Sequence, residues 1–346
     1  AGQNSFARTT LDRVGVIYVQ GEEGKLSLSA GRDITLTGGQ VVNSGSLSQT
    51  VLNAGRDLNL NAVATAVSDN LTWDKDNWLK QSATQHMGSA VNGAGSVLLT
   101  AGQDVKAQAA TVNAGDSLGV QAGRDISLTA ATDSSNFASH HKSTGGNGAL
   151  SKTTVTTHDV VNRETAQGSA FSGASVTMQA DNNLLIQGSS VAGDDDVRLA
   201  AGHNLAVTTA DEQSEESHQR QEKKSGLSGT GGLGLTWGNQ KLKVTDTAQD
   251  VTQQGSTVGS VNGNVSLTAG NELTVKGSNL VAGRDMALSG KQVNILAAEN
   301  QSSRTHSVEQ KSSRLTLALS IAEDCEIKQE MTQEKSAKHR KRRRLA

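Results

Sequence analysis

The stretch Ala30-Gly31-Arg32-Asp33-Ile34-Thr35-Leu36-Thr37 recurs along the chain with small changes. Close copies span residues 54–60, 122–128 and 282–288, and looser copies begin at Ala101, Ala201 and Ala269. Each copy joins a small-residue turn, where Gly permits unusual backbone angles and Asp or Asn can bond a nearby N–H, to an alternation of apolar and polar residues. That alternation is the period of a β-strand. One such unit cannot bury its apolar face alone, so the repetition predicts stacked units.

A longer period lies above the short one. Gly88, Gly168 and Gly255 open similar modules, 80 and 87 residues apart. Within each module the outer turns are 20 or 21 residues apart, as at Gly102 and Gly123. This spacing predicts one coil of about three short strands, with successive coils advancing by the strand spacing of ~4.8 Å.

The composition favours a thin core. Hydrophobic residues make up 34% of the chain and aromatic residues 2%, with 37 glycines and no proline. A compact enzyme of 346 residues would ordinarily use more large side chains. Many turns without proline are typical of strands that are paired on both edges, since proline removes a ladder donor.

Charge and cysteine content exclude several classes of protein. The formal net charge is −2, and without the five cations at 340–344 it is −2 − 5 = −7, so the body does not favour nucleic acid as a partner. The single cysteine, Cys325, allows no internal disulfide. The sequence contains no run of 18 apolar residues that would predict a membrane helix. No signal peptide is evident, so we expect a fragment of a longer chain.

Segments 61–87, 131–167, 211–254 and 298–320 lose the glycine turn and become more polar. We expect them to form strands or hairpins flanking the stack, or less regular coils within it. In the third segment, Leu233, Leu235 and Trp237 alternate before Gly238-Asn239, and Leu242 and Val244 alternate after it, which predicts a hairpin turning at 238–239. In the first segment, Leu71, Trp73 and Trp78 suggest a less regular hairpin. In the second segment, Val155 marks one strand.

The sequence therefore divides into three parts. Residues 1–21 form a weakly patterned lead-in with one expected strand at 16–19, and residues 22–320 carry the repeats. Residues 321–346 are a charged tail without the alternation, for which we expect disorder or a frameshifted end. Such a frameshift predicts continued repeat sequence in another reading frame of the gene downstream.

The Ala-Gly-Arg-Asp turns resemble the haemagglutinin repeats of large bacterial exoproteins such as filamentous haemagglutinins. The segment from Lys223-Lys224-Ser225-Gly226-Leu227 to Gly255-Ser256-Thr257-Val258-Gly259 is similar to the second repeat region of contact-dependent growth inhibition toxins. The resemblance covers about residues 22–320. Two family motifs are absent: the Asn-Pro motif of the N-terminal secretion domain and the Val-Glu-Asn-Asn motif that precedes the toxin.

The resemblance implies an all-β fold, a right-handed parallel β-helix (β-solenoid) with strand or hairpin insertions between modules. It also implies secretion through a dedicated outer-membrane two-partner transporter and display on the bacterial surface. The function implied is a stalk segment that presents an adhesive or toxin domain, or helps deliver it to a target cell. The implied partners are the transporter and the target-cell surface or outer membrane, with no small-molecule substrate.

Candidate chemistry is sparse. Asp194-Asp195-Asp196 is the one carboxylate cluster, and its place at a repeat corner favours a solvated turn over a polysaccharide-cleaving site. Six histidines are candidate metal ligands: His140, His141, His158, His203, His218 and His306. Their spacing does not recur as ligand pairs and no cysteine accompanies them, so we expect no metal site. We expect no catalytic residue and no cofactor.

Two further segments have alternative interpretations. Gly226 to Gly234 lacks the Gly-Lys-Ser/Thr ending of a phosphate-binding loop, and we interpret it as a weakly apolar strand, with contact to a membrane or partner as the alternative. Arg340 to Arg344 is interpreted as a disordered tail, with phosphate binding or a nuclear-type signal as alternatives.

The predicted interior rows consist of apolar residues from the repeats. They are Ile34, Leu36, Leu58, Leu60, Leu98, Val105, Ile126, Leu128, Leu184, Ile186, Leu205, Val207, Leu267, Leu273, Val275, Met286 and Leu288. Two functions compete with the stalk. One is a carbohydrate-active β-helix enzyme, which requires two or more acidic side chains on adjacent coils of one exposed sheet. The other is a self-assembling surface matrix protein that polymerises through open strand edges.

Overall fold

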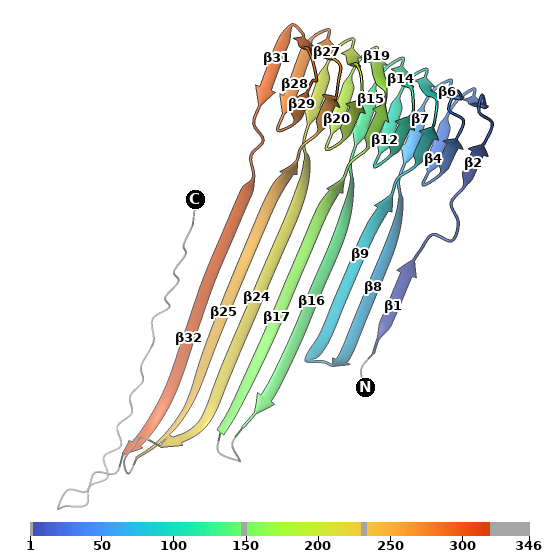
Figure 1. Cartoon of the computed structure of the whole chain (residues 1–346). Helices are drawn as coiled ribbons and strands as arrows, with labels where there is room; N and C mark the ends of the chain where they lie inside the picture. Colours follow the sequence, from blue (N-terminus) through green and yellow to red (C-terminus); the bar gives the residue numbers. More distant parts are fainter. Residues whose placement is uncertain (1–2, 147–150, 230–233, 319–346) are drawn as a thin grey trace, which may run out of the picture.

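A computed structural model describes residues 3–146, 151–229 and 234–318. These residues form three parallel sheets, which stack as a β-helix, and one antiparallel sheet, which projects from it (Figure 1). The expected all-β solenoid fold, with hairpins between the modules, is confirmed.

Each parallel sheet has eight strands. The first sheet contains β2 (Val16–Val19), β5 (Gln40–Asn43), β10 (Ala90–Gly93), β13 (Thr111–Ala114), β18 (Ala170–Gly173), β21 (Ser190–Gly193), β26 (Thr257–Ser260) and β29 (Asn279–Val281). The second contains β3 (Lys25–Ala30), β6 (Gln49–Ala54), β11 (Ser96–Ala101), β14 (Ser117–Ala122), β19 (Ser175–Ala180), β22 (Val197–Ala201), β27 (Val265–Ala269) and β30 (Met286–Ser289). The third contains β4 (Ile34–Thr37), β7 (Leu58–Asn61), β12 (Val105–Gln108), β15 (Ile126–Thr129), β20 (Leu184–Gln187), β23 (Leu205–Thr208), β28 (Glu272–Lys276) and β31 (Gln292–Leu296).

One strand from each sheet makes one coil, so the described residues form eight coils. The predicted coil length of 20 or 21 residues is confirmed. Val91 pairs with Val112 of the next coil, and Phe171 pairs with Val191 of the next coil. Parallel register places like residues in rows. Alanines Ala30, Ala54, Ala101, Ala122, Ala180, Ala201 and Ala269 form one such row along the second sheet. This row explains why alanine precedes the glycine in the copies at the end of the second sheet, since a small side chain fits inside the corner.

The antiparallel sheet, which we call the hairpin sheet, also has eight strands. In spatial order they are β1 (Ser5–Thr9), β8 (Val63–Asp74), β9 (Asn77–Met87), β16 (Ala131–Gly145), β17 (Ser151–Gln167), β24 (Ala210–Gly229), β25 (Gly234–Gln254) and β32 (Gln301–Ala318). A hairpin leaves the β-helix after every second coil and returns to start the next, which is visible in Figure 1.

The prediction of a hairpin turn at Gly238-Asn239 is wrong. These two residues lie inside β25 and pair with Gly226 and Ser225 of β24, so the strand continues through them. The actual connection between β24 and β25 comes earlier, within 230–233, outside the described residues. Alternation around Gly-Asn did not distinguish a turn from a long strand with a glycine in it. The turn suggested by Leu71, Trp73 and Trp78 does lie between β8 and β9.

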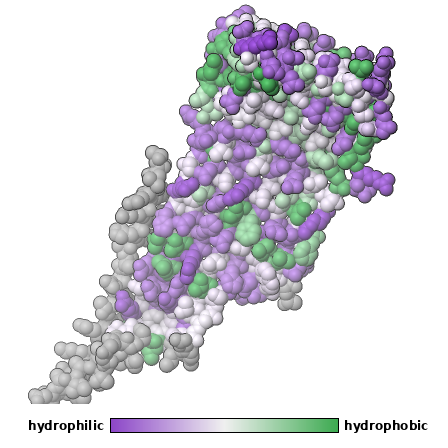
Figure 2. Space-filling view, in the orientation of Figure 1, coloured by the Kyte–Doolittle hydropathy of each residue, from purple (hydrophilic) through white to green (hydrophobic). Residues whose placement is uncertain are grey.

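The interior of the β-helix matches the predicted rows with two exceptions. Leu98 is 36% exposed, because its neighbours Val97 and Leu99 in β11 point inward and the alternation turns Leu98 outward. Met286 is 41% exposed although it pairs with buried Val265, because no further described coil covers it. Apolar residues are exposed at both ends of the stack (Figure 2). Ile17, opposite buried Val41, is 42% exposed at one end, and Ile295, opposite buried Val275, is 72% exposed at the other.

Coils without a hairpin close through a tight corner between the third and first sheets. The corner residues are Gly38, Ala109, Gly188 and Gly277, and each has a positive φ between 50° and 61°. A Cβ at Gly188 would lie 2.5 Å from Cβ of Ala210, the first residue of the next hairpin. Glycine is therefore required at Gly188 by both backbone conformation and space, while Ala109 carries the conformational strain.

We expect Gly188→Ala to lower the free energy of unfolding by about 2 kcal/mol, because it adds left-handed strain and a clash with Ala210. The reverse change at the equivalent corner, Ala109→Gly, relieves strain and should alter stability by less than about 1 kcal/mol. Urea unfolding followed by circular dichroism measures both. Equal destabilisation by the two variants would contradict this account of the corners.

Candidate functional site

Three of the four Gly-Arg-Asp copies, at 31–33, 55–57 and 123–125, lie at the corner between the second and third sheets, and the fourth, at 283–285, lies between the first and second. The Arg56 guanidinium donates from Nε and Nη2 to the two Asp33 carboxylate oxygens at 2.9 and 2.6 Å. Arg124 holds Asp104 in the same bidentate way at 2.7 and 2.6 Å. In both pairs the arginine belongs to the coil after the aspartate. The motif therefore connects one coil to the next.

The acidic side chains of this corner also accept backbone N–H groups of the following coil. Asp57 N donates to Asp33 Oδ1 at 3.3 Å, and Asn183 N donates to Asp125 Oδ1 at 3.0 Å. Asn204 continues the pattern by accepting the Glu272 N–H at 3.3 Å. Asp57 and Asn183 accept the Asp104 and Asn204 N–H groups in the same way, and we call this row of Asp and Asn side chains the corner ladder.

The motif glycine is needed for a reason different from the one predicted. Gly31, Gly55 and Gly123 do not have positive φ, so backbone freedom is not what selects them. A Cβ at Gly55 would lie 2.3 Å from the carbonyl oxygen of Gly31, and one at Gly123 would lie 2.3 Å from that of Gly102. Close approach of successive coils is the constraint.

Asp104 is the most strongly held carboxylate of the ladder and its side chain is buried. The hydrogen bonds from Arg124 hold its pKa far below the ordinary value, although burial opposes this. Lys106 Nζ, 2.9 Å from the same carboxylate, adds to the lowering. Asp104 in turn raises the pKa of Arg124. The site is charge-balanced and saturated with donors, and this favours a structural role.

A second row, of buried serines, lies at the corner between the third and first sheets. Ser169 N donates to Ser189 Oγ at 3.0 Å, Ser189 N donates to Ser256 Oγ at 3.1 Å, and Ser256 N donates to Ser278 Oγ at 3.1 Å. Each hydroxyl donates to a carbonyl at the end of the third sheet, as Ser169 does to Thr129 O at 2.9 Å. Of these serines, the sequence pattern marks Ser169 and Ser256, each next to a module-opening glycine, and it does not indicate the row.

The two faces of the hairpin sheet differ in charge. Alternate residues of a strand point to opposite faces, so the printed register assigns each side chain to a face. One face, which we call the paired face, carries the ion pairs Arg8–Asp69, Asp159–His218, Arg163–Glu216, Glu222–Lys224, Asp246–His306 and Asp250–Arg304. Most of these pairs join adjacent strands, whereas Glu222 and Lys224 lie two residues apart on β24.

The opposite face, which we call the lysine face, carries a ring cluster. Trp78 stacks on His140 with centroids 5.8 Å apart, and His158 meets both rings at 5.8 and 5.7 Å. Lys80 Nζ lies 5.2 Å from the Trp78 ring centroid, a cation–π contact. The cluster packs β9, β16 and β17 together, and two of the histidines considered as metal ligands belong to it.

The other candidate residues are dispersed. Asp196 lies at a corner between the first and second sheets, where its carboxylate accepts a hydrogen bond of 2.9 Å from the Asn264 backbone N–H. Asp194 and Asp195 are exposed beside it. His203 is exposed at a corner of the second and third sheets, and His218 and His306 each bond an aspartate on the paired face. Gly226 and Gly238 pair directly and border a hollow of about 430 Å³. Arg340 to Arg344 lie outside the described residues.

Within 3–146, 151–229 and 234–318, no group of three His, Cys, Asp or Glu side chains is placed to hold a metal ion. The same residues contain no helix that could span a membrane.

Fold and corner chemistry define a repeat protein of the β-solenoid class. The family model for the hemagglutinin repeat matches residues 74–223, 150–249 and 235–343, which together cover more than half of the chain. The chain belongs to the hemagglutinin-repeat family.

The chain is similar to named toxins. It is 38% identical over 266 residues to a 16S rRNA endonuclease CdiA of Enterobacter cloacae, covering 76% of this chain and 8% of the relative. It is 35% identical over 317 residues to a tRNA nuclease CdiA of Escherichia coli, covering 85% of this chain and 9% of the relative. A Toxin CdiA of Yersinia pestis is 44% identical over 181 residues, 52% of this chain and 6% of the relative. The chain thus corresponds to a small part of each relative's length. No solved structure matches it.

Asp104→Asn should lower the free energy of unfolding at pH 7 by about 1–2 kcal/mol, because it replaces a carboxylate bound by Arg124 and Lys106. Since folding lowers the pKa of Asp104, its contribution is present above pH ~4 and is lost as the pH falls toward the folded-state pKa. The difference between variant and parent should therefore shrink between about pH 4 and pH 2. Urea unfolding at several pH values measures it.

The matched control is Asp116→Asn, at an exposed corner residue. It should leave stability within about 0.5 kcal/mol of the parent. A difference for Asp104→Asn that stays constant from pH 7 to pH 2 would contradict the role assigned to its charge.

Proposed function

We propose that this chain is a segment of the β-helical stalk of a large secreted bacterial exoprotein of the contact-dependent inhibition type, displayed at the cell surface. The observation that supports this best is the eight-coil stack, whose sheets end in exposed apolar coils at both ends. Such ends suit continuation by further coils on either side. The similarity to CdiA toxins over most of this chain supports the same function.

In this proposal the stalk acts mechanically. Backbone hydrogen bonds between coils and interior apolar rows keep it stiff, so a distal adhesive or toxin domain is held away from the secreting cell. The nuclease activities in the names of relatives would belong to domains other than these repeats. The partners proposed are the two-partner transporter of the parent protein and a target-cell surface.

The described residues give little support to the alternative function of a carbohydrate-active enzyme. Hydrolysis of glycosidic bonds uses paired carboxylates. Among the strands of the three parallel sheets, Glu272 is the one carboxylate, and its neighbour on the next coil is Gln292. The paired acids on adjacent coils that such an enzyme requires are not found there.

The stalk proposal predicts that length follows the number of coils. Duplicating residues 88–167 in the parent protein, which adds two coils and one hairpin, should lengthen the filament by about 10 Å per copy, since each coil advances by about 4.8 Å. Several tandem copies bring the change within reach of electron microscopy of the secreted protein. Filaments whose length does not change with copy number would refute the stalk.

A self-assembling matrix is the second candidate, because apolar residues such as Ile295 and Ile17 are exposed at opposite ends of the stack. Light scattering of the purified chain at rising concentration separates the two functions. A stalk segment reaches a constant mass, whereas a matrix protein grows steadily with concentration.

A further inference from the structure

The ion pairs of the hairpin sheet join one hairpin to the next. The boundaries between hairpins or end strands, which we call the seams, are β1–β8, β9–β16, β17–β24 and β25–β32. Seven ion pairs cross these seams: Arg8–Asp69, Asp76–Lys142, His86–Asp133, Asp159–His218, Arg163–Glu216, Asp246–His306 and Asp250–Arg304. The other ion pairs of the sheet lie within β24. Among the described residues, none joins the two strands of one hairpin.

Three of the four seams are held by a histidine and an aspartate. At β9–β16, Asp133 Oδ1 lies 3.0 Å from His86 Nδ1 and also accepts the His86 backbone N–H at 2.7 Å. At β17–β24, Asp159 Oδ1 lies 2.9 Å from His218 Nδ1. A ring nitrogen this close to a carboxylate oxygen is assigned the hydrogen, so each imidazole donates to its aspartate.

Two side chains bond across a seam although another partner lies opposite them within the hairpin. His218 is directly opposite Asp159 across the seam and directly opposite Asp246 in its own hairpin, and its Nδ1 bonds Asp159. Asp246 is likewise opposite both His218 and His306, and it bonds His306 across the next seam. Acid and base thus alternate over four adjacent strands, with the side-chain bonds directed to the seams.

A seam depends on side-chain contacts more than the interior of a hairpin does. The two strands of a hairpin are connected by a short turn, which keeps them close. The strands of a seam are connected only through coils of the β-helix, as residues 168–209 connect β17 to β24. Opposite charges that face each other across antiparallel strands stabilise the pairing. Charges at the seams therefore influence how firmly consecutive hairpins adhere.

Few other charges face these three histidines. The charged groups opposite or beside them are Asp133, Asp159 and Asp246 on neighbouring strands, and Glu216, Arg220 and Arg304 on their own strands. The glutamate and the two arginines each have an ion-pair partner of their own. Across β8, His86 faces the uncharged Ala64. The aspartates are therefore the charges that a protonated imidazole meets at each seam.

We propose that the seams form a pH-sensitive lock of the hairpin sheet. Histidine gains a proton as the pH falls through about 6.5, and aspartate stays ionised above about pH 4. Between these values each His–Asp contact joins opposite charges, and consecutive hairpins adhere most firmly. As the pH rises above about 6.5 the positive charge is lost, and the hairpins separate more readily at their seams. The arginine and lysine pairs hold the seams throughout this range.

The ring cluster of the lysine face responds in the opposite sense. His140 and His158 lie directly opposite each other within the hairpin β16–β17, with Lys80 beside the same cluster. Protonation gives these two imidazoles like charges, which oppose strand pairing. Acidification therefore loosens the interior of this hairpin while it tightens the seams, and the seam at β25–β32, which lies away from the cluster, is the place to test the lock.

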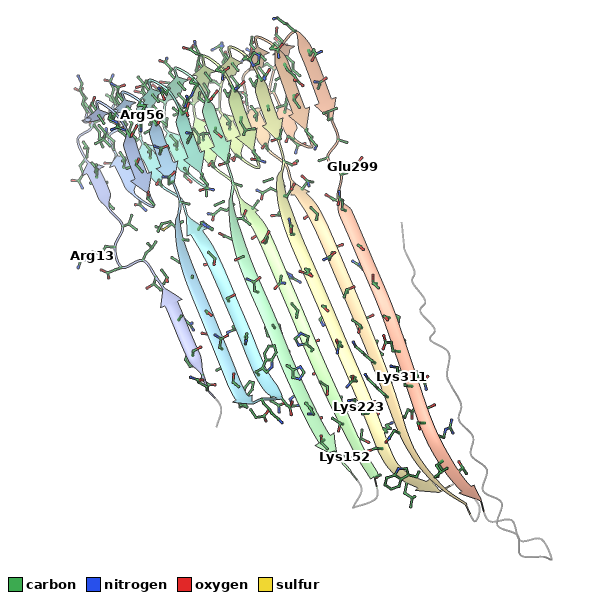
Figure 3. All side chains as sticks on the ribbon, turned by 180° about the vertical axis from the view of Figure 1, so that it is seen from behind. Arg13, Arg56, Lys152, Lys223, Glu299 and Lys311 are labelled. Carbon is green, nitrogen blue, oxygen red and sulfur yellow. The ribbon has the colours of Figure 1, made fainter. Side chains whose placement is uncertain are left out.

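The strand β32 reports on that seam alone. Among the described residues it pairs only with β25, so each of its amides that is bonded in the sheet is bonded across the seam. In Figure 3, Glu299 marks where the chain leaves the β-helix for this strand, and Lys311 lies on its distal half. Hydrogen exchange of residues 301–318 therefore measures how often the seam opens.

The test compares this exchange in the whole chain at about pH 5.5 and pH 7.5, on either side of the histidine range, after correction for intrinsic rates. In the parent we expect about threefold or greater protection at the lower pH, the order of effect of one cross-strand ion pair. His306→Gln keeps an N–H donor without a titrating charge, so its protection should be equal at both pH values. Asp246→Asn should also remove the gain, because the imidazolium then meets no carboxylate.

The matched control is His203→Gln, at an exposed histidine of a β-helix corner, which should keep the parent's ratio. Exchange of β27 in the same samples verifies that each variant has folded its coils. A parent ratio near one, a ratio retained by either seam variant, or a ratio lost in the control would overturn the proposal. Each of these results would leave the stalk function intact, since stacking of the coils does not involve the seam residues.

Discussion

The spacing of hydrogen-bonded strands is the constraint on which the architecture depends. Strands in a sheet lie about 4.8 Å apart whether they are parallel or antiparallel. Each module contributes two coils to the β-helix and two strands to the hairpin sheet. Both structures therefore advance by the same distance per module, about 10 Å. Because the two advances match, the hairpins of successive modules meet edge to edge and form one continuous sheet beside the stack.

The corners keep this register in place. At one corner, arginine and aspartate of successive coils bind in pairs such as Arg124 with Asp104, and Asp or Asn side chains accept the next coil's N–H groups. At another, serine hydroxyls pass hydrogen bonds from coil to coil. Glycines such as Gly55 let successive backbones approach closely. Polar groups that would otherwise be buried without partners thus define how one coil lies on the next.

Sequence periodicity was sufficient for the β-helix and insufficient for the hairpin sheet. Alternation and the 20- or 21-residue spacing predicted the coils, because each repeats a local pattern. The long strands have polar residues on both faces, so alternation carries little information about them. The turn was accordingly misplaced at Gly238-Asn239. Leu98 was assigned to the interior because two adjacent leucines follow Val97, and only the register shows which of them points inward.

Contacts between hairpins illustrate the same limit. Lys223, Lys241 and Lys311 are far apart in sequence, and no local motif connects them. Their alignment depends on the pairing of β24, β25 and β32, which the sequence alone does not give. The Asp–Arg pairs at the corners were likewise invisible, although Gly-Arg-Asp itself was the most evident repeat in the chain.

The match between coils and hairpin strands is tested most directly by comparing two deletions. Removing residues 88–167 takes out a whole module, two coils with their hairpin, and keeps the numbers of coils and hairpin strands equal. Removing residues 168–187 takes out a single coil and leaves the hairpin sheet one strand too long for the stack. We expect urea unfolding to show a clearly larger loss in free energy of unfolding, corrected for chain length, for the single-coil deletion than for the module deletion. The amides of its hairpin strands should also be less protected from hydrogen exchange. Equal or greater stability of the single-coil deletion would contradict the account.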